Sequence, residues 1–287
     1  MNRWLTLAAA TILATLVVLS VAAPVLEMLL GHNPEEVDLS ARFEAPSLSH
    51  PLGTDDLGRD VFLRLLYGGR VSLTVGVVAA LAAASVGTLV GLLAGYFRGR
   101  LDALLMRLTD AVIALPLLPL LIILAAVDLS KLGLGVLAQS ESASLYRIIL
   151  IITLVGWTSV ARLVRGTTLS LLGRDFVRAA FALGARAPRI MFVHILPNAV
   201  SPIIVATTLA VGNVILFESV LSFLGLGIQP PVPSWGNMLT NAQEMIGSAP
   251  LLAVWPGLLI LATVAACNIL ADAAAARMRP GSGAGRR

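Results

Sequence analysis

The chain of 287 residues has a net charge of +4 at pH 7 and a mean hydropathy of +0.91; 57% of its residues are hydrophobic and only 13% are charged. A soluble domain cannot bury so much apolar surface, so the composition excludes a soluble protein and indicates an integral membrane protein. The single cysteine, Cys267, excludes a disulfide within the chain, and we interpret it as a small buried hydrophobic residue.

Six apolar runs are long enough, or nearly so, to cross the hydrocarbon core of a bilayer, so we predict an all-α fold with six transmembrane helices. The predicted helices are Leu5–Leu30, Val71–Tyr96, Leu104–Val127, Ile148–Leu163, Asn198–Leu221 and Leu251–Asp272. The first run has features of a cleaved signal peptide, because Arg3 precedes it and small residues occupy positions 20–22. Its 26 residues exceed the length of a signal core, so we predict an uncleaved anchor.

The distribution of charge predicts the orientation in the membrane. With the N-terminus inside, the inner segments hold fourteen arginines and four acidic residues, whereas the outer segments hold six basic and twelve acidic residues. Basic residues concentrate on the cytoplasmic side of membrane proteins, so we predict that both termini are cytoplasmic. The positive charge is therefore a topology signal and does not indicate a nucleic-acid partner, because no aromatic residues are interleaved with the arginines.

The predicted external segment 31–70 contains a string rich in Pro and Gly, residues 50–60, which predicts tight turns. These turns bring several polar side chains close together, namely Thr54, Asp55, Asp56, Arg59 and Asp60. One interpretation is a docking surface or a cation site. We favour the other, in which the carboxylates pair with the arginine and hold the loop on the helix ends.

Small and charged residues mark the helices that follow. Glycine or alanine recurs every three or four residues along the second run, which predicts close packing against another helix. These residues are Gly76, Ala80, Ala84, Gly87, Gly91 and Gly95.

We expect Asp110, in the third run, to pair with Arg107 rather than to face an aqueous cavity. Arg162 and Arg165 share a helix face, where contact with anionic lipid and contact with a cytoplasmic partner are both open. The polar external loop 128–147 has no assigned function.

The segment Asp175–Asn198 is a basic island between two apolar runs, and it predicts two short helices joined at Gly184. Asp175 is placed to cap the first helix, since its carboxylate can accept from free N–H groups of the first turn. Pro188 suits the first turn of the second helix, where a missing N–H costs nothing. Pro197 then marks the entry into the fifth run. Such an elbow on the cytoplasmic side has the shape of a docking element.

The fifth run carries Asn213 and Glu218. An ionisable side chain costs about 2–3 kcal/mol or more to leave in lipid, so it marks a functional site. We predict that both residues face a central translocation path, and the alternative is a hydrogen-bonding role between helices. The following loop 222–238 contains three closely spaced prolines and predicts a rigid external lid, in which Trp235 alternatively anchors at the interface. We expect the tail 273–287 to be flexible.

Motifs for nucleotide binding, hydrolysis and metal binding are absent from the sequence. It has no Gly-x4-Gly-Lys-Ser/Thr phosphate loop, and its one lysine, Lys131, follows no such loop. It has no His-Glu-x-x-His, no Gly-x-Ser-x-Gly and no Cys/His cluster, and we interpret His194 as a structural hydrogen-bond donor. We therefore predict no catalytic residue, no metal and no cofactor in this chain, so energy from ATP must come from a partner.

Several of these strings resemble one family. Ala179 and Ala180, followed by Gly184 and by Leu196-Pro197, resemble the EAA loop of ABC-importer permeases. The residues from 194 to 198 resemble the ending used by the peptide and nickel branch. The strings 50–60 and 222–238 are similar to those of C-type permease subunits of dipeptide and oligopeptide importers. Arg178 departs from the family, which has glutamate at this position, so a salt bridge from that glutamate is not carried over.

The resemblance covers about residues 51–272 and implies a type I ABC-importer permease fold, with a five-helix core and one added N-terminal helix. It divides the chain into an N-terminal helix with its external segment (1–70), a transmembrane domain (71–272) with the elbow 175–198, and a cytoplasmic tail (273–287). The implied function is a permease subunit of the inner membrane that moves di- or oligopeptides by alternating access. Nickel, opine and glutathione are the alternative substrates.

The implied partners are a second, similar permease subunit, one or two cytoplasmic ATPases that bind ATP and Mg²⁺, an external substrate-binding protein and membrane lipid. In the family the elbow sits in a groove of the ATPase. ATPase coupling is thereby assigned to Arg178, Ala179, Ala180, Gly184, Arg186, Pro188, His194 and Pro197.

Two other classes of function stay open on the residues alone. An ATP-independent secondary transporter or channel would be expected to carry more intramembrane charges than Asp110 and Glu218. A membrane scaffold without transport predicts that the polar residues of the fifth run are dispensable.

Overall fold

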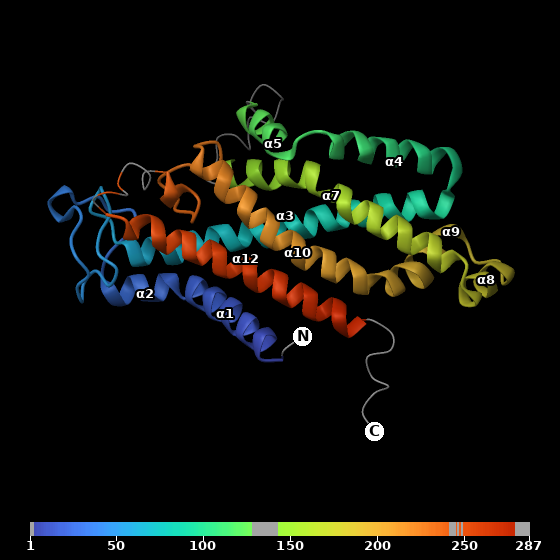
Figure 1. Ribbon diagram of the computed structural model, residues 1–287, viewed down its shortest axis with the longest axis horizontal. Helices are drawn as coiled ribbons and strands as arrows, with labels where there is room; N and C mark the ends of the chain where they lie inside the picture. Colours follow the sequence, from blue (N-terminus) through green and yellow to red (C-terminus); the bar gives the residue numbers. More distant parts are fainter. Residues whose placement is uncertain (1–2, 128–142, 241–244, 246, 248, 279–287) are drawn as a thin grey trace.

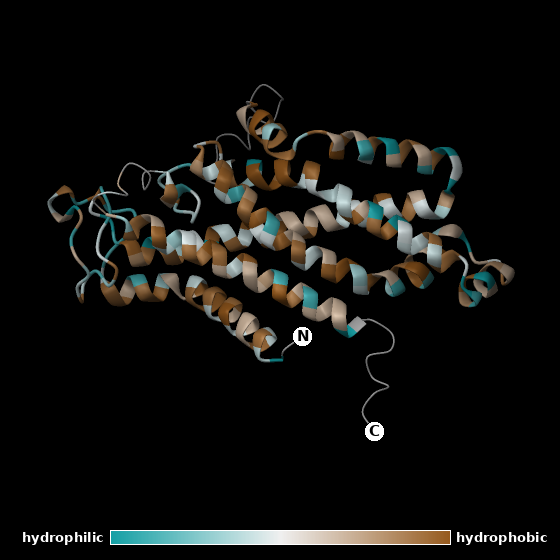
Figure 2. Ribbon diagram, viewed as in Figure 1, coloured by the Kyte–Doolittle hydropathy of each residue, from teal (hydrophilic) through white to brown (hydrophobic). Residues whose placement is uncertain are grey.

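The computed structural model describes residues 3–127, 143–240, 245, 247 and 249–278, which form a bundle of long helices with loops gathered at its two ends (Figure 1). Figure 2 shows hydrophobic residues along most of the helix length, and hydrophilic residues concentrated toward the two ends. The described residues contain no strand, only an isolated bridge between Thr54 and Asp60. Most of the predicted loop 128–147 and the tail from residue 279 lie outside the described residues.

The long helices lie side by side along the bundle axis (Figure 1). They are α1 (Arg3–Val21), α2 (Ala23–Leu30), α3 (Val61–Phe97), α4 (Gly99–Ala114), α5 (Leu117–Ala126), α7 (Ala143–Leu172), α8 (Asp175–Ala182), α9 (Ala187–Arg189), α10 (Leu196–Phe223) and α12 (Leu251–Met278). A π-helical segment, η3 (Ile190–Ile195), joins α9 to α10, and two short 3₁₀ helices lie in the loops, η1 (Leu39–Ala41) and η4 (Asn237–Leu239). Five helical stretches of the described chain are long and apolar enough to span a membrane, and α4 with α5 makes a sixth if the bent pair counts as one span.

The predicted third span, Leu104–Val127, corresponds to two helices, α4 and α5, whose axes differ in direction by 90°. Pro116 disfavours the helical conformation of the residue before it, and Leu115 accordingly adopts an extended backbone with φ −80° and ψ 138°. The bend places α5 across the end of α4 (Figure 1).

Several helices extend beyond the predicted boundaries. Residues 61–69, which belong to the predicted external segment 31–70, form the first turns of the 37-residue α3. Asp60 starts this helix, because its carboxylate accepts a hydrogen bond from the Leu63 N–H at 2.7 Å. The expected flexible tail is helical up to Met278, since its alanines continue α12.

The helix α3 lies in the middle of the bundle and crosses α7 at very short range (Figure 1). A Cβ atom on Gly87 would lie 2.4 Å from the Trp157 carbonyl oxygen, and one on Gly91 would lie 2.6 Å from the Ala161 carbonyl oxygen. The prediction that small residues on this helix serve close packing is therefore confirmed.

The charged string 50–60 forms the self-contained cluster that the sequence favoured. Arg59 pairs with Asp55 at 2.8 Å, and Arg64 from α3 approaches the same carboxylate at 3.6 Å. His50 Nδ1 lies 2.9 Å from Asp60 Oδ2. These contacts hold segment 31–60 against the start of α3, at the end of the bundle opposite α8 (Figure 1).

Candidate functional site

The elbow between α7 and α10 starts with α8, which has eight residues. The prediction that Asp175 caps this helix is wrong, because Arg174 occupies the N-cap position and no side-chain capping bond forms. Asp175 lies in the first helical turn, where its negative charge interacts favourably with the positive end of the helix dipole.

Gly184 ends α8 in the left-handed conformation, with φ +77°. The Ala185 N–H donates to the Ala180 carbonyl at 3.0 Å, and the Gly184 N–H donates to the Phe181 carbonyl at 2.9 Å. This pair of bonds is a Schellman motif, whose left-handed residue is usually glycine because other side chains are strained there. The predicted break at Gly184 is thereby confirmed.

A continuous helix follows the break. Pro188 lies in the first turn of α9, as predicted, and α9, η3 and α10 together form one stretch of 37 residues, Ala187–Phe223. Pro197 therefore does not separate two helices. It lies in the first turn of α10, which continues directly from the π-helical turn of η3. π-Helical turns within α-helices are frequent at functional sites.

The inner face of α8 packs on the bundle through Val177 and Ala180, both buried in a cluster that includes Ile190 and Ile195 of η3. Phe181 stacks on Tyr96 at the end of α3, with ring centroids 6.2 Å apart. The outer face remains apolar and unoccupied: Phe176 and Phe181 are each nearly half exposed, and Leu183 is 88% exposed.

The exposed apolar side chains lie among basic ones. The arginines of the elbow are all exposed, namely Arg174, Arg178, Arg186 and Arg189. None of them forms an ion pair with another described residue. Exposed apolar side chains that alternate along the chain with unpaired arginines are suited to a partner surface that offers both apolar and acidic groups.

The structure places the residues assigned to coupling in this one elbow. Six of them are exposed, namely Arg178, Ala179, Gly184, Arg186, Pro188 and Pro197. Ala180 is buried, and His194 is half-buried. The His194 carbonyl accepts from the Asn198 side-chain amide at 2.7 Å, but the ring itself bonds to no described residue, so the expected donor role of His194 is wrong.

Two ion pairs join α4 to α7 on the same half of the molecule. Arg165 donates to both carboxylate oxygens of Asp102, at 2.5 and 2.6 Å, and Arg162 pairs with Asp110. The expected partner of Asp110, Arg107, is therefore wrong: a neighbouring helix supplies the cation. Arg162 and Arg165 thus both pair with aspartates of α4, and their contact with lipid or with a cytoplasmic partner stays a prediction.

We expect the Arg165–Asp102 pair to hold α4 against α7. The variant Arg165→Asp places two carboxylates together and should lower the free energy of unfolding by about 1 kcal/mol. The double variant Asp102→Arg with Arg165→Asp should recover most of that loss. Denaturation in detergent measures the stability of the single and the double variant. The matched control is Arg100→Asp, because Arg100 lies on the same turn of α4 as Asp102 but forms no ion pair with another described residue. Equal stability of the single and double variants would contradict this role.

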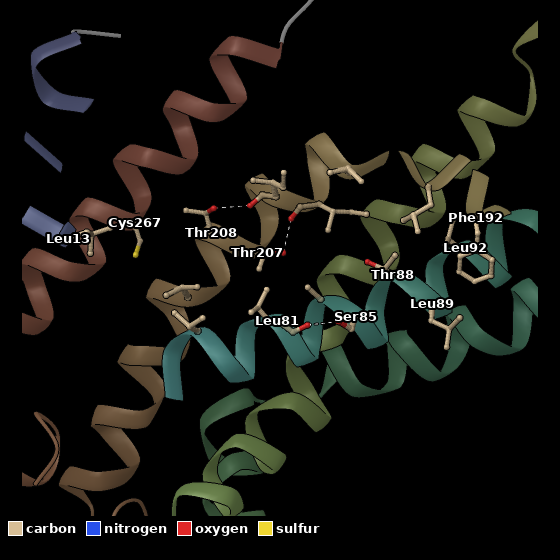
Figure 3. Close-up of a pocket in the computed structure, with 17 residues that line it drawn as sticks. Leu13, Leu81, Ser85, Thr88, Leu89, Leu92, Phe192, Thr207, Thr208 and Cys267 are labelled. Carbon is tan, nitrogen blue, oxygen red and sulfur yellow. Dashed lines mark hydrogen bonds between the residues drawn. The ribbon is translucent and has the colours of Figure 1, made fainter. Parts of the chain in front are cut away.

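A groove of about 720 Å³ runs between α3 and α10 (Figure 3). Leu13 of α1 and Cys267 of α12 lie at one end of it, and Phe192 lies at the other. Its lining is mostly apolar, and the hydroxyls of Thr207 and Thr208 donate at 2.8 Å to carbonyls of their own helix. The groove therefore suits a lipid chain or an apolar helix better than a hydrophilic solute.

A second cavity, of about 470 Å³, lies between α5, α7 and α10. Asn213 lines it, is exposed, and its amide makes no hydrogen bond to a described residue. Ser159 and Thr158 of α7 line the same cavity. The cavity offers a small set of polar groups within apolar walls, which is the usual composition of a solute site.

The prediction that Glu218 faces a central path is wrong. Its side chain is fully buried and accepts hydrogen bonds from Ser72 at 2.9 Å and from Ser222 at 2.7 Å. Glu218 thus takes the alternative role, hydrogen bonding between helices. Trp235 is no interfacial anchor either, because it is 1% exposed and its Nε1 donates to the Leu65 carbonyl. The sequence reasoning missed Ser72, whose only signal was its place on the buried face of α3.

Residues 87–282 match the family described as binding-protein-dependent transport system inner membrane component. The chain is 39% identical over 261 residues to the dipeptide transport system permease protein DppC of Alkalihalophilus pseudofirmus, which covers 91% of this chain and 81% of that protein. It is 35% identical to the oligopeptide transport system permease protein OppC of Bacillus subtilis, with 91% and 80% covered. It is 40% identical over 229 residues to the glutathione transport system permease protein GsiD of Pectobacterium atrosepticum, with 80% and 72% covered.

Proposed function

The chain belongs to the family of binding-protein-dependent transport system inner membrane components and is a permease subunit of an ABC importer, and on this premise we propose that it carries di- or oligopeptides across the cytoplasmic membrane. The observation that carries the substrate class is the similarity, over nine-tenths of the chain, to permeases named for dipeptide and oligopeptide transport. Glutathione is the second candidate, because permeases named for it match four-fifths of the chain. Glutathione is itself a short peptide, so both candidates share one substrate chemistry.

The subunit acts without catalytic groups of its own in this proposal. ATP and Mg²⁺ bind to one or two ATPase subunits, a second permease subunit completes the membrane path, and an external binding protein delivers the peptide. Among the described residues, no three His, Cys, Asp or Glu side chains lie close enough to hold a metal ion. The assignment to a family of transport components supports this division of labour.

The elbow is the docking element for the ATPase in this proposal. Its exposed aromatic and leucine side chains and its exposed arginines lie on α8 and the turn that follows it, which project at one end of the bundle (Figure 1). The ends of α1 and α12 nearest the termini point toward the elbow, whereas segment 31–60 lies at the opposite end (Figure 1). We place the elbow and both termini in the cytoplasm, because the arginine-rich end of a membrane protein faces inward.

Movement of the elbow reaches the membrane through α10. When the ATPases close on ATP, they displace α8, and α9–η3–α10 follows as one helix of about 55 Å. The peptide then enters from outside, and ATP hydrolysis restores the inward-facing state. Asn213, which lines the cavity of about 470 Å³, is the residue of the fifth span that we assign to the translocation path.

Purification of the chain from its native membrane, followed by reconstitution into liposomes, tests this function. We expect an ATPase and a second permease subunit to co-purify, and we expect uptake of labelled di- and tripeptides to require ATP and the binding protein. Competition between peptide and glutathione separates the two candidates. Uptake in the absence of any ATPase would instead establish a secondary transporter or channel, and normal uptake with Asn213→Ala would remove Asn213 from the path.

A further inference from the structure

The carboxylate of Glu218 is the centre of a buried hydrogen-bond relay near the outer end of the bundle. The hydroxyls of Ser72, on α3, and Ser222, on α10, both donate to it. Each oxygen of the Glu218 carboxyl group accepts one of these bonds, so both hydroxyl hydrogens point toward Glu218 and both serine oxygens can accept from other donors.

Each serine oxygen accepts from the backbone of the outer loop, defined here as residues 224–240. The Trp235 N–H donates to Ser72 Oγ at 3.2 Å, and the Ile228 N–H donates to Ser222 Oγ at 3.0 Å. One acidic side chain therefore fixes the loop at two points, through two serines on two helices. Replacing Glu218 by Gln would leave one serine hydroxyl without an acceptor, because the amide nitrogen can only donate.

The backbone of the outer loop also lies directly on the helices. A Cβ atom on Gly227 would lie 2.2 Å from Ser222 Oγ, and one on Gly236 would lie 2.6 Å from the Cα of Ser219. The Trp235 ring fills a buried position against α3. The loop is thus seated on α3 and α10, and the relay sets its position there.

Glu218 and the second part of the elbow lie on the same helical stretch. The stretch Ala187–Phe223 begins within the elbow and ends five residues after Glu218. A displacement of α8 that moves this helix therefore moves the anchor of the outer loop at its other end. The two ends of the molecule in Figure 1 are connected by this one element.

We propose that Glu218 is a positioning residue that latches the outer loop to α3 and α10, so that the loop follows the movement of the elbow. The inference rests on the proposed function as a permease subunit. Glu218 does not touch the peptide; it acts through Ser72 and Ser222. The outer mouth is opened and closed in step with ATP because the loop cannot move independently of α10.

The isosteric variant Glu218→Gln tests the latch with two measurements on the assembled, reconstituted importer. Hydrogen–deuterium exchange of peptides spanning 224–240 should become about tenfold faster, since one of the buried hydrogen bonds that hold the loop is lost, while exchange at 175–198 stays unchanged. The number of ATP molecules hydrolysed per peptide transported should rise severalfold. A purely structural role would reduce the amount of folded importer but not change this ratio.

Single-arm variants keep the test decisive even where Glu218→Gln fails to insert. Ser72→Ala should speed exchange around Trp235, and Ser222→Ala should speed exchange around Ile228, each with a raised ATP-to-peptide ratio. Thr74→Ala is the matched control, because its hydroxyl bonds only to a carbonyl of its own helix.

Wild-type exchange in 224–240, or faster exchange with an unchanged ATP-to-peptide ratio, overturns the proposal. Failure of the proposed function is distinguished by the wild-type preparation, which would then contain no ATPase. Exchange in the isolated subunit would still report whether Glu218 holds the loop.

Discussion

The variant Gly184→Trp is expected to abolish recovery of the ATPase with the purified subunit, while the subunit itself still inserts and folds. The physical reason lies in the space around Gly184. A Cβ atom built there meets no other atom within 4 Å, so the indole has room on the elbow, which also exposes Phe176, Phe181 and Leu183. A bulky ring within the proposed docking element is expected to prevent close approach of the partner. Co-purification followed by quantification of the ATPase measures the result.

A matched control lies at the opposite end of the bundle from the elbow. Gly225 ends α10 with φ +73°, a Cβ there also meets nothing within 4 Å, and its N–H donates to the Ser222 carbonyl in the same type of helix-ending motif. Gly225→Trp therefore carries the same strain, about 1–2 kcal/mol for a left-handed residue, without touching the elbow. We expect this variant to recover the ATPase at the wild-type level. Equal losses in both variants would attribute the effect to strain, and recovery with Gly184→Trp would remove the elbow from the docking site.

Local features of the elbow could be predicted from the sequence because they depend on single residues. Gly184 stops a helix through its backbone freedom, and Pro188 starts one through its fixed φ. The long apolar runs likewise predicted the transmembrane helices, although several of the predicted helices were too short. Polar residues near a helix end do not stop a helix that can continue into water, so α3 and α10 extend beyond the hydrocarbon-length segments.

Pairings between distant segments could not be predicted in the same way. Asp110 had Arg107 nearby in sequence, but Arg162 comes closer in space because α7 lies alongside α4. Glu218 had the properties of a residue on a transport path, and its burial depends on Ser72, which lies 146 positions earlier in the chain. The 90° turn between α4 and α5 depends on packing against α7 as well as on Pro116, so the proline alone indicated an interruption and not its angle.

The close crossing of α3 and α7 supports the second large prediction, that Gly91→Leu strongly destabilises the subunit. A Cβ atom at this position would lie 2.6 Å from the Ala161 carbonyl oxygen and 2.7 Å from Val164 Cβ, and a backbone carbonyl cannot rotate away as a side chain can. The helices α3 and α7 must separate to admit the leucine, and the lost packing is expected to cost about 3 kcal/mol or more. Thermal unfolding of the detergent-solubilised subunit measures the loss.

The control for this variant is Gly166→Leu, because Gly166 lies on α7 and a Cβ there meets nothing within 4 Å. A leucine at Gly166 should leave the unfolding temperature unchanged or raise it, since leucine favours a helix by about 1 kcal/mol over glycine. An unchanged unfolding temperature for Gly91→Leu would contradict the close crossing. A fall for Gly91→Leu alone would establish that the bundle depends on contact between two backbones, and that the elbow at the end of α7 is positioned by this contact.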